Sequence, residues 1–241
     1  MRALILCAGE GSRLRPLTWL MPKPLVPVAG TPMVLRQALA LKRAGIDEIV
    51  INAAAGSRRL RGALGDGSRW GLRFLWSVEG EEASDALETL GGAALALPLL
   101  TAGGEDRFLI VAGDIATDFD YASLRQRAEE LSPGGALAHL VFVSNPPYHP
   151  QGDMTLGADG AVHRRGAEAG ETLTFSSLGA YHASLFSGVE PQRAALFPWL
   201  YQFVDEGRVT GERFDGRWAN VGTLEELARA EALFASKKTR P

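Results

Sequence analysis

The sequence predicts an α/β protein with a largely parallel central sheet. Short apolar runs alternate with stretches of helical periodicity, and 46% of the 241 residues are apolar. Such alternation is typical of βαβ units, in which most strands are buried on both faces. The apolar runs lie at residues 3–7, 49–52, 72–77, 108–112 and 136–143. A chain of this length can bury a full core, so we expect one domain that spans residues 1–241.

Helix signals flank the central part of the chain. Thr31 is placed to cap a helix that has Pro32 at its first position, continues through MVLRQALALKRA and ends at Gly45. Thr223 and Glu226 form a capping-box pattern before LEELARAEALFA, and KKTRP follows as a basic tail. We therefore expect one helix shortly after the first strand and another near the end of the sequence.

The second half of the chain has a different composition, rich in proline, glycine and residue pairs that favour turns. The turn sequence GADG, residues 157–160, lies between short extended segments. The segment TLTFSSLGAYH, residues 172–182, predicts a further strand. We expect these residues to elaborate the same domain.

Charge, cysteine content and hydropathy exclude a nucleic-acid partner, a disulfide framework and a membrane span. The formal net charge of -3 supplies no basic field for nucleic acid, so a phosphate ligand must be held by locally placed cations. Cys7 is the only cysteine, which excludes an internal disulfide framework. The sequence contains neither a signal-peptide core nor an apolar run of membrane length. We expect a cytoplasmic protein with a small-molecule site and no membrane partner.

A glycine-rich and proline-rich loop follows the first strand. Gly9 and Gly11 let backbone N–H groups approach an anion, and Arg13, Arg15 and Lys23 add cations. A dinucleotide fingerprint would need a third glycine and an immediate helix, and a Walker loop would need Gly-Lys-Ser/Thr. The loop has neither arrangement. Because open sheets bind ligands at the carboxyl ends of their strands, we interpret the loop as a polyphosphate site.

A carboxylate is expected at the same edge of the sheet. The segment FLIVAGDIATDFD is an apolar strand that ends in Gly-Asp, with the aspartate at position 114. A hard oxygen ligand beside a phosphate site indicates Mg²⁺. On its own, a strand-end aspartate is as often a helix cap or a turn former. Together with the loop, Asp114 is a candidate metal ligand.

The stretch GEGSRLRPLTWLMPKPLVPVAGTPM, residues 9–33, resembles the signature of the sugar-phosphate nucleotidyltransferases, GxGxRLxPxTxxxPKPxxPxxxxP. In that family the loop holds a nucleoside triphosphate, and the arginine and the PKP lysine contact its phosphates. The resemblance implies Arg15, Lys23 and Asp114 as catalytic residues, with Arg13 as a helper. It also implies a three-layer, Rossmann-like nucleotidyltransferase fold with a mixed, mostly parallel central sheet.

Two further segments extend the resemblance. VEGEEASDALETLGG is similar to the family's base-binding region, and RWANVGT is similar to a segment that usually supplies a second metal-binding aspartate, where this chain has Asn220. Asparagine can bind a cation through its amide oxygen. We therefore expect Asp114 and Asn220 to bind Mg²⁺. The nucleotide-binding candidates are Leu6, Ala8, Gly9, Gly11, Ser12, Arg13, Lys23, Gly80 and Gly91.

The sugar site is expected in residues 131–241, with residues 1–130 mainly binding the nucleotide. The segments VFVSNPPYHPQGDMTL, TFSSLGAYHASLFSG and GERFDGRWANVGT resemble the compact N-acetylmuramate α-1-phosphate uridylyltransferases of this family. Hydroxyl-rich ligands need paired donors and acceptors, so Asn145, Asp153 and Ser176 are the sugar-binding candidates. Each of these residues has a structural interpretation of equal weight. The four histidines show no metal spacing.

The resemblance implies a transferase that joins a sugar 1-phosphate to UTP and gives a UDP-sugar and pyrophosphate. The best match is N-acetylmuramate α-1-phosphate in peptidoglycan recycling. One alternative is another pyrophosphorylase, either a mannose-1-phosphate guanylyltransferase or a glucose-1-phosphate thymidylyltransferase. Another is a catalytically weak nucleotide-sugar binding protein. The expected partners are UTP and the sugar 1-phosphate, and we expect a monomer or a weak dimer.

Overall fold

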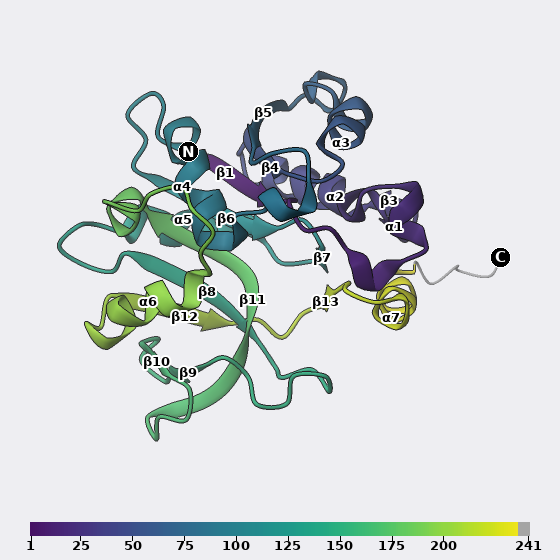
Figure 1. Cartoon of the computed structure of the whole chain (residues 1–241). Coiled ribbons are helices and arrows are strands. Elements are labelled where there is room, and N and C mark those ends of the chain that lie inside the picture. Colours follow the sequence, from purple (N-terminus) through teal and green to yellow (C-terminus); the bar gives the residue numbers. More distant parts are fainter. Residues whose placement is uncertain (236–241) are drawn as a thin grey trace.

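A mixed sheet of nine strands forms the centre of the computed structural model, which describes residues 1–235 (Figure 1). Its strands are β1 (Arg2–Leu6), β4 (Glu48–Ala53), β5 (Arg73–Val78), β6 (Arg107–Ala112), β8 (Ala138–Val143), β9 (Met154–Gly157), β10 (Val162–Arg164), β11 (Gly170–His182) and β12 (Val209–Arg213). They follow the order β10-β9-β11-β6-β1-β4-β5, with β8 beside β11 and β12 beside β8. The α/β class, the mixed sheet and the positions of the expected strands are confirmed.

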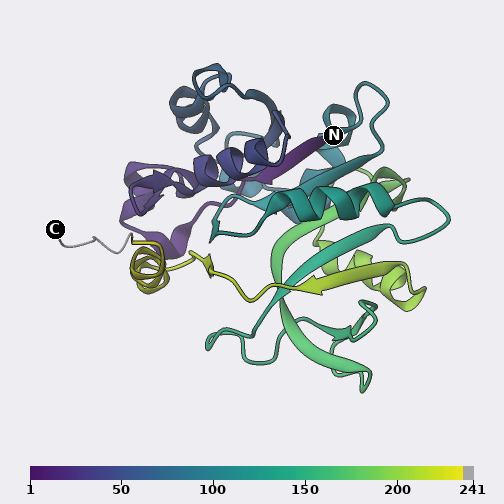
Figure 2. The same cartoon turned by 180° about the vertical axis from the view of Figure 1, so that it is seen from behind.

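Helices cover both faces of the sheet and create three layers. The helices are α2 (Met33–Arg43), α3 (Ser57–Leu64), α4 (Glu88–Leu100), α5 (Tyr121–Glu130) and α6 (Leu196–Asp205). Successive strand residues point to opposite faces, so Ala3 and Ile5 of β1 share a core cluster with α2 and α5, whereas Leu4 shares one with α4 and α6. Figure 2 views the sheet from the side of α2 and α5. Within residues 1–235, no helix combines the length and apolar character needed to cross a bilayer.

The first half of the sheet is parallel, and β11 connects it to the second half. β1 pairs in parallel with β6 and β4, and β4 pairs in parallel with β5. β11 pairs antiparallel with β6, β8 and β9. Phe175 of β11 pairs with Phe142, whereas Gly179 pairs with Leu140, so β11 has two more residues than β8 between these pairs. This β-bulge changes where the intervening side chains point.

The last helix packs beneath the loop that follows β1. The remaining strands and α-helices are α1 (Leu17–Leu20), β2 (Pro27–Val28), β3 (Thr31–Pro32), β7 (Ile115–Thr117), β13 (Trp218–Asn220) and α7 (Leu224–Phe234). Ala230 of α7 shares a buried cluster with Leu14 and Met33. The Glu231 carboxylate accepts the Ala29 N–H at 3.0 Å. Both views show α7 beside the N-terminal loop (Figures 1 and 2).

The predicted helix ends are confirmed in part. Gly45, with φ of +77°, ends α2 as expected. The prediction that Thr31 caps α2 is wrong, because Thr31 pairs with Val28 in β3 and the helix begins at Met33 with no side-chain cap. Backbone pairing of Thr31 replaces the capping contact.

The start of α7 follows the predicted capping pattern with one change. Thr223 Oγ1 accepts the Glu226 N–H at 3.2 Å. The Glu226 carboxylate accepts the N–H of Gly222 at 2.7 Å instead of the N–H of Thr223. This contact fixes the backbone that precedes the helix. The basic tail KKTRP lies outside the described residues.

Two helical glycines allow a matched test of packing. A Cβ at Gly91 in α4 would lie 2.0 Å from the Gln192 carbonyl oxygen, whereas a Cβ at Gly62 in α3 would meet nothing within 4 Å. Gly91→Ala should lower the free energy of unfolding by about 1–3 kcal/mol, because backbone must move. Gly62→Ala should raise it by about 0.5–1 kcal/mol through helix propensity. Urea denaturation measures both values, and shifts of the same sign would contradict this packing of α4.

Candidate active site

The loop after β1 is shaped by the close approach of Gly11 to Lys23. Gly11 has φ of +70°, and a Cβ there would lie 2.8 Å from the Lys23 Cβ. Only glycine satisfies both conditions without strain. Thr18 Oγ1 donates to the Gly11 carbonyl at 2.9 Å and holds the loop in this turn. The loop is therefore folded against the lysine that the sequence singles out.

Lys23 and Asp114 form an ion pair between the loop and the central sheet. Lys23 Nζ donates to Asp114 Oδ2 at 2.5 Å, and the lysine is only 9% exposed. Asp114 lies in the turn between β6 and β7. A buried lysine normally requires an acidic partner. The structure thus brings together two residues that are 91 positions apart and that the sequence predicts as catalytic.

A buried glutamine holds the turn that carries Asp114. Gln37 Nε2 donates to the carbonyls of Ala112 and Ile115, at 3.3 and 3.0 Å, which lie on either side of the aspartate. Tyr121 donates its hydroxyl proton to Gln37 Oε1 at 2.5 Å. Gln37 is 1% exposed. Sequence reasoning missed this residue, although a glutamine on the apolar face of a helix is an available signal.

A second polar bridge ties the loop to the start of α4. Asn52 Oδ1 accepts the N–H of Ala8 at 3.1 Å, and Asn52 Nδ2 donates to Glu79. The other Glu79 oxygen accepts the Leu87 N–H at 2.8 Å. Burial raises the pKa of Glu79 above its usual range. The sequence signal for Asn52 is a polar residue at the carboxyl end of a buried strand.

Two adjoining cavities open around these contacts. The first, called the loop cavity, has a volume of about 270 Å³ and is lined by Leu6, Cys7, Gly9, Glu10, Gly11, Ser12, Arg13, Lys23, Pro24, Asp114 and Gly222. The second, called the central cavity, has a volume of about 410 Å³ and is lined by Leu6, Ala8, Gly9, Asn52, Ala86, Glu88, Thr89, Ala112, Asp114, Ser177 and Asn220. Because Asp114 lines both, a ligand can extend from one cavity into the other past this carboxylate.

The backbone is strained around the central cavity. Glu88 and Ser177 have φ values of +59° and +63°, a region that side-chain-bearing residues rarely adopt. Ser177 lies within the bulge of β11. Such strain is concentrated at functional sites, where the surrounding structure over-determines the backbone. The central cavity is therefore a candidate binding site on geometric grounds as well.

Asn220 lines the same cavity as Asp114, and its side-chain oxygen is a candidate cation ligand. It pairs with Ile115 across β13 and β7, and both Asn220 and Asp114 line the central cavity. Its Oδ1 atom is buried and has no hydrogen-bond partner in the described part of the chain. A buried acceptor without a partner is costly unless a ligand or ion satisfies it. The residue thus has the chemistry of a cation ligand.

The protein supplies few ligands for such a cation. No group of three or more His, Cys, Asp or Glu side chains within residues 1–235 could hold a metal ion. Burial and the Asp114 charge raise the pKa of the Cys7 thiol beneath the loop, which keeps it neutral. A cation at Asp114 and Asn220 would therefore need further oxygen atoms from a bound ligand.

The two loop arginines occupy different places. Arg13 lines the loop cavity, and a Cβ at Gly222 would lie 3.1 Å from its Nη2 atom. Arg15 lines neither cavity; it is exposed and forms an ion pair with Glu10. The family resemblance implies Arg15 as catalytic and Arg13 as a helper. In the structure it is Arg13 that lines the same cavity as Lys23 and Asp114.

Two of the nucleotide-binding candidates lie outside the cavity walls. Gly91 packs its α-carbon against the backbone at Gln192, and Gly80 packs against the Asp85 side chain. The wall of the central cavity is formed instead by the neighbouring Ala86 and Thr89. The remaining candidates, Leu6, Ala8, Gly9, Gly11, Ser12, Arg13 and Lys23, line one or both cavities.

The three sugar-binding candidates are engaged in structural hydrogen bonds. Asn145 donates to the Thr172 carbonyl and accepts from Thr174, both at 2.9 Å. Asp153 accepts the Phe175 N–H at 2.8 Å.

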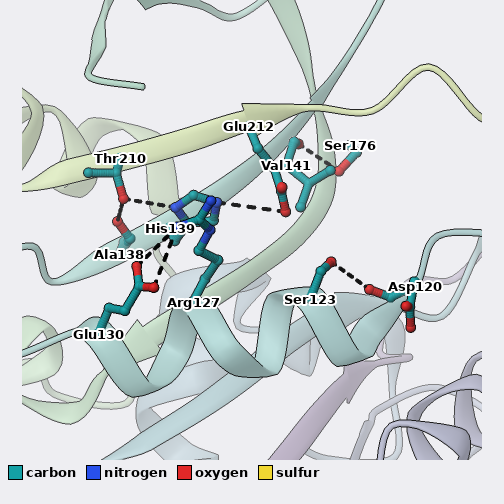
Figure 3. Close-up of polar contacts among 10 residues, drawn as sticks. All are labelled: Asp120, Ser123, Arg127, Glu130, Ala138, His139, Val141, Ser176, Thr210 and Glu212. Carbon is teal, nitrogen blue, oxygen red and sulfur yellow. Dashed lines mark hydrogen bonds and ion pairs between the residues drawn. The ribbon is translucent and has the colours of Figure 1, made fainter. Parts of the chain in front are cut away.

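Ser176 is fully buried and donates to the Val141 carbonyl at 2.6 Å (Figure 3). The β11 bulge places the neighbouring Ser177, and not Ser176, in the wall of the central cavity.

The histidines take structural positions. His139 is buried in β8, where Nδ1 lies 2.8 Å from Thr210 Oγ1 and Nε2 lies 3.8 Å from Glu212 (Figure 3). His149 contacts Asp153 at 3.0 Å. Burial lowers the pKa of His182 below its usual range. None of the four histidines lines the loop or central cavity.

This combination of fold and site defines a family. The profile of the nucleotidyl transferase family matches residues 2–164, and the chain belongs to that family. It is 44% identical over 239 residues to N-acetylmuramate alpha-1-phosphate uridylyltransferase of Neisseria meningitidis serogroup B, covering 99% of this chain and 100% of the relative.

More distant relatives share the same family. The chain is 38% identical over 243 residues to mannose-1-phosphate guanyltransferase beta-B of Xenopus laevis, covering 97% of this chain and 64% of the relative. A crystal structure from Bacillus anthracis, assigned to the glucose-1-phosphate thymidylyltransferases and complexed with sucrose, superposes with a TM-score of 0.82 at 21% identity. It covers 100% of this chain and 98% of that one, and it shows the fold alone.

The role of Gln37 can be tested with a pair of variants. Gln37→Leu removes both donors that flank Asp114, so we expect kcat to fall about tenfold or more, since small displacements of a reacting group are costly. Tyr121→Phe leaves these donors in place and should retain most of the activity. Pyrophosphate release under nucleotidyl transfer conditions measures both. Equal activity losses in the two variants would contradict a positioning role for Gln37.

Proposed function

We propose that this protein joins N-acetylmuramate α-1-phosphate to UTP and releases pyrophosphate, as a cytoplasmic enzyme of peptidoglycan recycling. The observation that carries the proposal is the mostly buried Lys23–Asp114 pair, in which Lys23 lines the loop cavity and Asp114 lines both the loop cavity and the central cavity. The choice of sugar and base is supported by the relative that is 44% identical over nearly the whole chain. The more distant relatives carry names with other sugars and bases.

The reaction forms one phosphorus–oxygen bond and breaks another. A phosphate oxygen of the sugar 1-phosphate attacks the α-phosphorus of UTP in line, and pyrophosphate leaves with the electron pair of the broken bond. The attacking phosphate is already an anion, so the protein mainly aligns two anions and offsets their repulsion. No covalent intermediate with the protein is required.

Lys23 and Arg13 supply the positive charge in the loop cavity. An ammonium group has three donors, so Lys23 can keep Asp114 Oδ2 and still donate to a phosphate oxygen. Gly9 and Gly11 both line the loop cavity, and the space beside the Gly9 α-carbon is open, so the loop backbone can approach an anion. Arg15 stands outside the cavity wall in an exposed pair with Glu10, from which it can reach a phosphate only by exchanging partners.

Asp114 and Asn220 fit a magnesium ion. Both residues line the central cavity and carry hard oxygen atoms, and the Asn220 oxygen is buried without a partner among residues 1–235. Bound Mg²⁺ would offset charge on the phosphate oxygens. Because the protein contributes one carboxylate and one amide, the triphosphate has to complete the ligand set.

The decisive experiment is a matrix of UTP, GTP and dTTP against the 1-phosphates of N-acetylmuramate, mannose and glucose. Pyrophosphate release is expected to be fastest for UTP with N-acetylmuramate α-1-phosphate. Faster release with GTP and mannose 1-phosphate, or with dTTP and glucose 1-phosphate, would replace the proposed substrates. Tight binding of a UDP-sugar with no turnover in any combination would instead indicate a binding protein.

Removing either member of the central ion pair should abolish most catalysis. Lys23→Ala and Asp114→Ala are each expected to lower kcat about a hundredfold or more, on the scale of one electrostatic donor in a transition state. Lys42→Ala is the control, because Lys42 binds the Trp70 carbonyl and lines neither cavity. Near-normal pyrophosphate release by either variant of the pair would show that the site is assigned incorrectly.

The metal-ligand role of Asn220 predicts opposite effects of two substitutions. Asn220→Asp adds a carboxylate beside Asp114, so the Mg²⁺ concentration for half-maximal activity should fall. Asn220→Ala removes the oxygen and should raise that concentration. Magnesium titrations of pyrophosphate release measure both values. An unchanged requirement in both variants would exclude Asn220 as a ligand.

A further inference from the structure

A third cavity adjoins the candidate active site on the side of α7. This α7 cavity has a volume of about 320 Å³ and lies between the segment after β8, the segment that leads into β13, and α7. Asn220 lines both the α7 cavity and the central cavity. A ligand held at Asp114 and Asn220 can therefore place a substituent in the α7 cavity.

Tyr148 contributes a hydroxyl group to the wall of the α7 cavity. It lines the α7 cavity, and burial together with the carboxylates of Glu226 and Asp114 raises the pKa of Tyr148 to about 12. Arg229 acts on the same hydroxyl in the opposite direction. The Tyr148 hydroxyl is therefore an uncharged group on this wall near neutral pH.

The walls of the α7 cavity are mostly apolar. Pro146, Pro147, Phe214, Trp218 and Leu233 contribute to them. Trp218 Nε1 already donates to the Ser176 carbonyl at 3.0 Å, so its ring offers only apolar surface. Such walls suit the methyl and C–H groups of a sugar substituent.

Arg229 is the only cation among the described residues that line this cavity, and its present partner is easily exchanged. It pairs with Glu225 one helical turn away, where the two side chains are 56% and 75% exposed. Exposed pairs of this kind contribute little to stability. The lining carboxylates are engaged elsewhere: Glu226 accepts the Gly222 N–H, and Asp215 pairs with Arg213.

We propose that the α7 cavity binds an acidic ether substituent on the sugar ring, such as the lactyl group of N-acetylmuramate, and that Arg229 binds its carboxylate. The apolar wall accommodates the methyl group of the same substituent. This inference rests on the proposed function and makes Arg229 a specificity-determining residue. A neutral sugar that lacks the acid would leave Arg229 with Glu225.

The test compares two nucleotide sugars that differ only in the lactyl ether, UDP-N-acetylmuramate and UDP-N-acetylglucosamine. In Arg229→Gln, the Kd of UDP-N-acetylmuramate should rise about tenfold or more, the scale of a lost hydrogen bond to a charged group. The Kd of UDP-N-acetylglucosamine should stay unchanged. Isothermal titration calorimetry measures both constants, and steady-state kinetics should show the same split in KM for the two sugar 1-phosphates.

Two further variants separate this role from a structural one. Glu225→Gln frees Arg229 and should lower the Kd of UDP-N-acetylmuramate, which loss of a structural ion pair would not do. Arg127→Gln is the matched control, because Arg127 pairs with Glu130 on α5 and lines none of the three cavities (Figure 3). It should change neither constant.

The outcomes distinguish the inference from the proposed function. If the unaltered protein forms UDP-N-acetylmuramate but Arg229→Gln weakens both nucleotide sugars equally, or weakens neither, the role of Arg229 is wrong and the proposed function stands. If the unaltered protein does not form UDP-N-acetylmuramate, the proposed function fails and the inference fails with it.

Discussion

The candidate site depends on the contact between Lys23 and Asp114. The lysine belongs to the loop after β1 and the aspartate to the turn after β6, and the pair is mostly buried. Burial strengthens the mutual attraction of the two charges, but it also makes either charge costly without the other. The loop that carries Lys23 and the turn that carries Asp114 therefore have to stay in contact. The hydrogen bonds around them hold both segments in place.

Backbone and side-chain contacts brace the pair from opposite sides of the sheet. Gln37, on α2, fixes the aspartate turn, and Asn52, at the end of β4, fixes the start of the loop. Both are almost fully buried polar groups, at 1% exposure each. Buried amides that satisfy backbone groups in this way make a local geometry rigid.

Local patterns in the sequence were sufficient to predict the strands, and the family signature singled out the residues that join the N-terminal loop to the edge of the sheet. Apolar runs indicated the buried strands, Asp114 was found from its place at the end of a strand, and Lys23 was found from the PKP motif of the family signature. Contacts that depend on register were not accessible from sequence. A two-residue bulge decides that Ser177 faces the cavity while Ser176 binds Val141, and neighbouring serines carry no local signal of that choice. Likewise, the local sequence predicts that Thr31 caps a helix, whereas in the structure Thr31 pairs with Val28 of β2.

The packing of α7 beneath the N-terminal loop has a consequence for synthesis of the protein. Ala29 and Glu231 are 202 residues apart in the chain. At a ribosomal rate of 5–20 residues per second, roughly 10–40 s separate the emergence of the loop from that of the helix that supports it. During this interval the apolar underside of the loop, at Leu14 and Val26, has no α7 to cover it. The nascent chain thus exposes the N-terminal loop in an unsupported form until α7 has emerged, which is a period in which a chaperone can act.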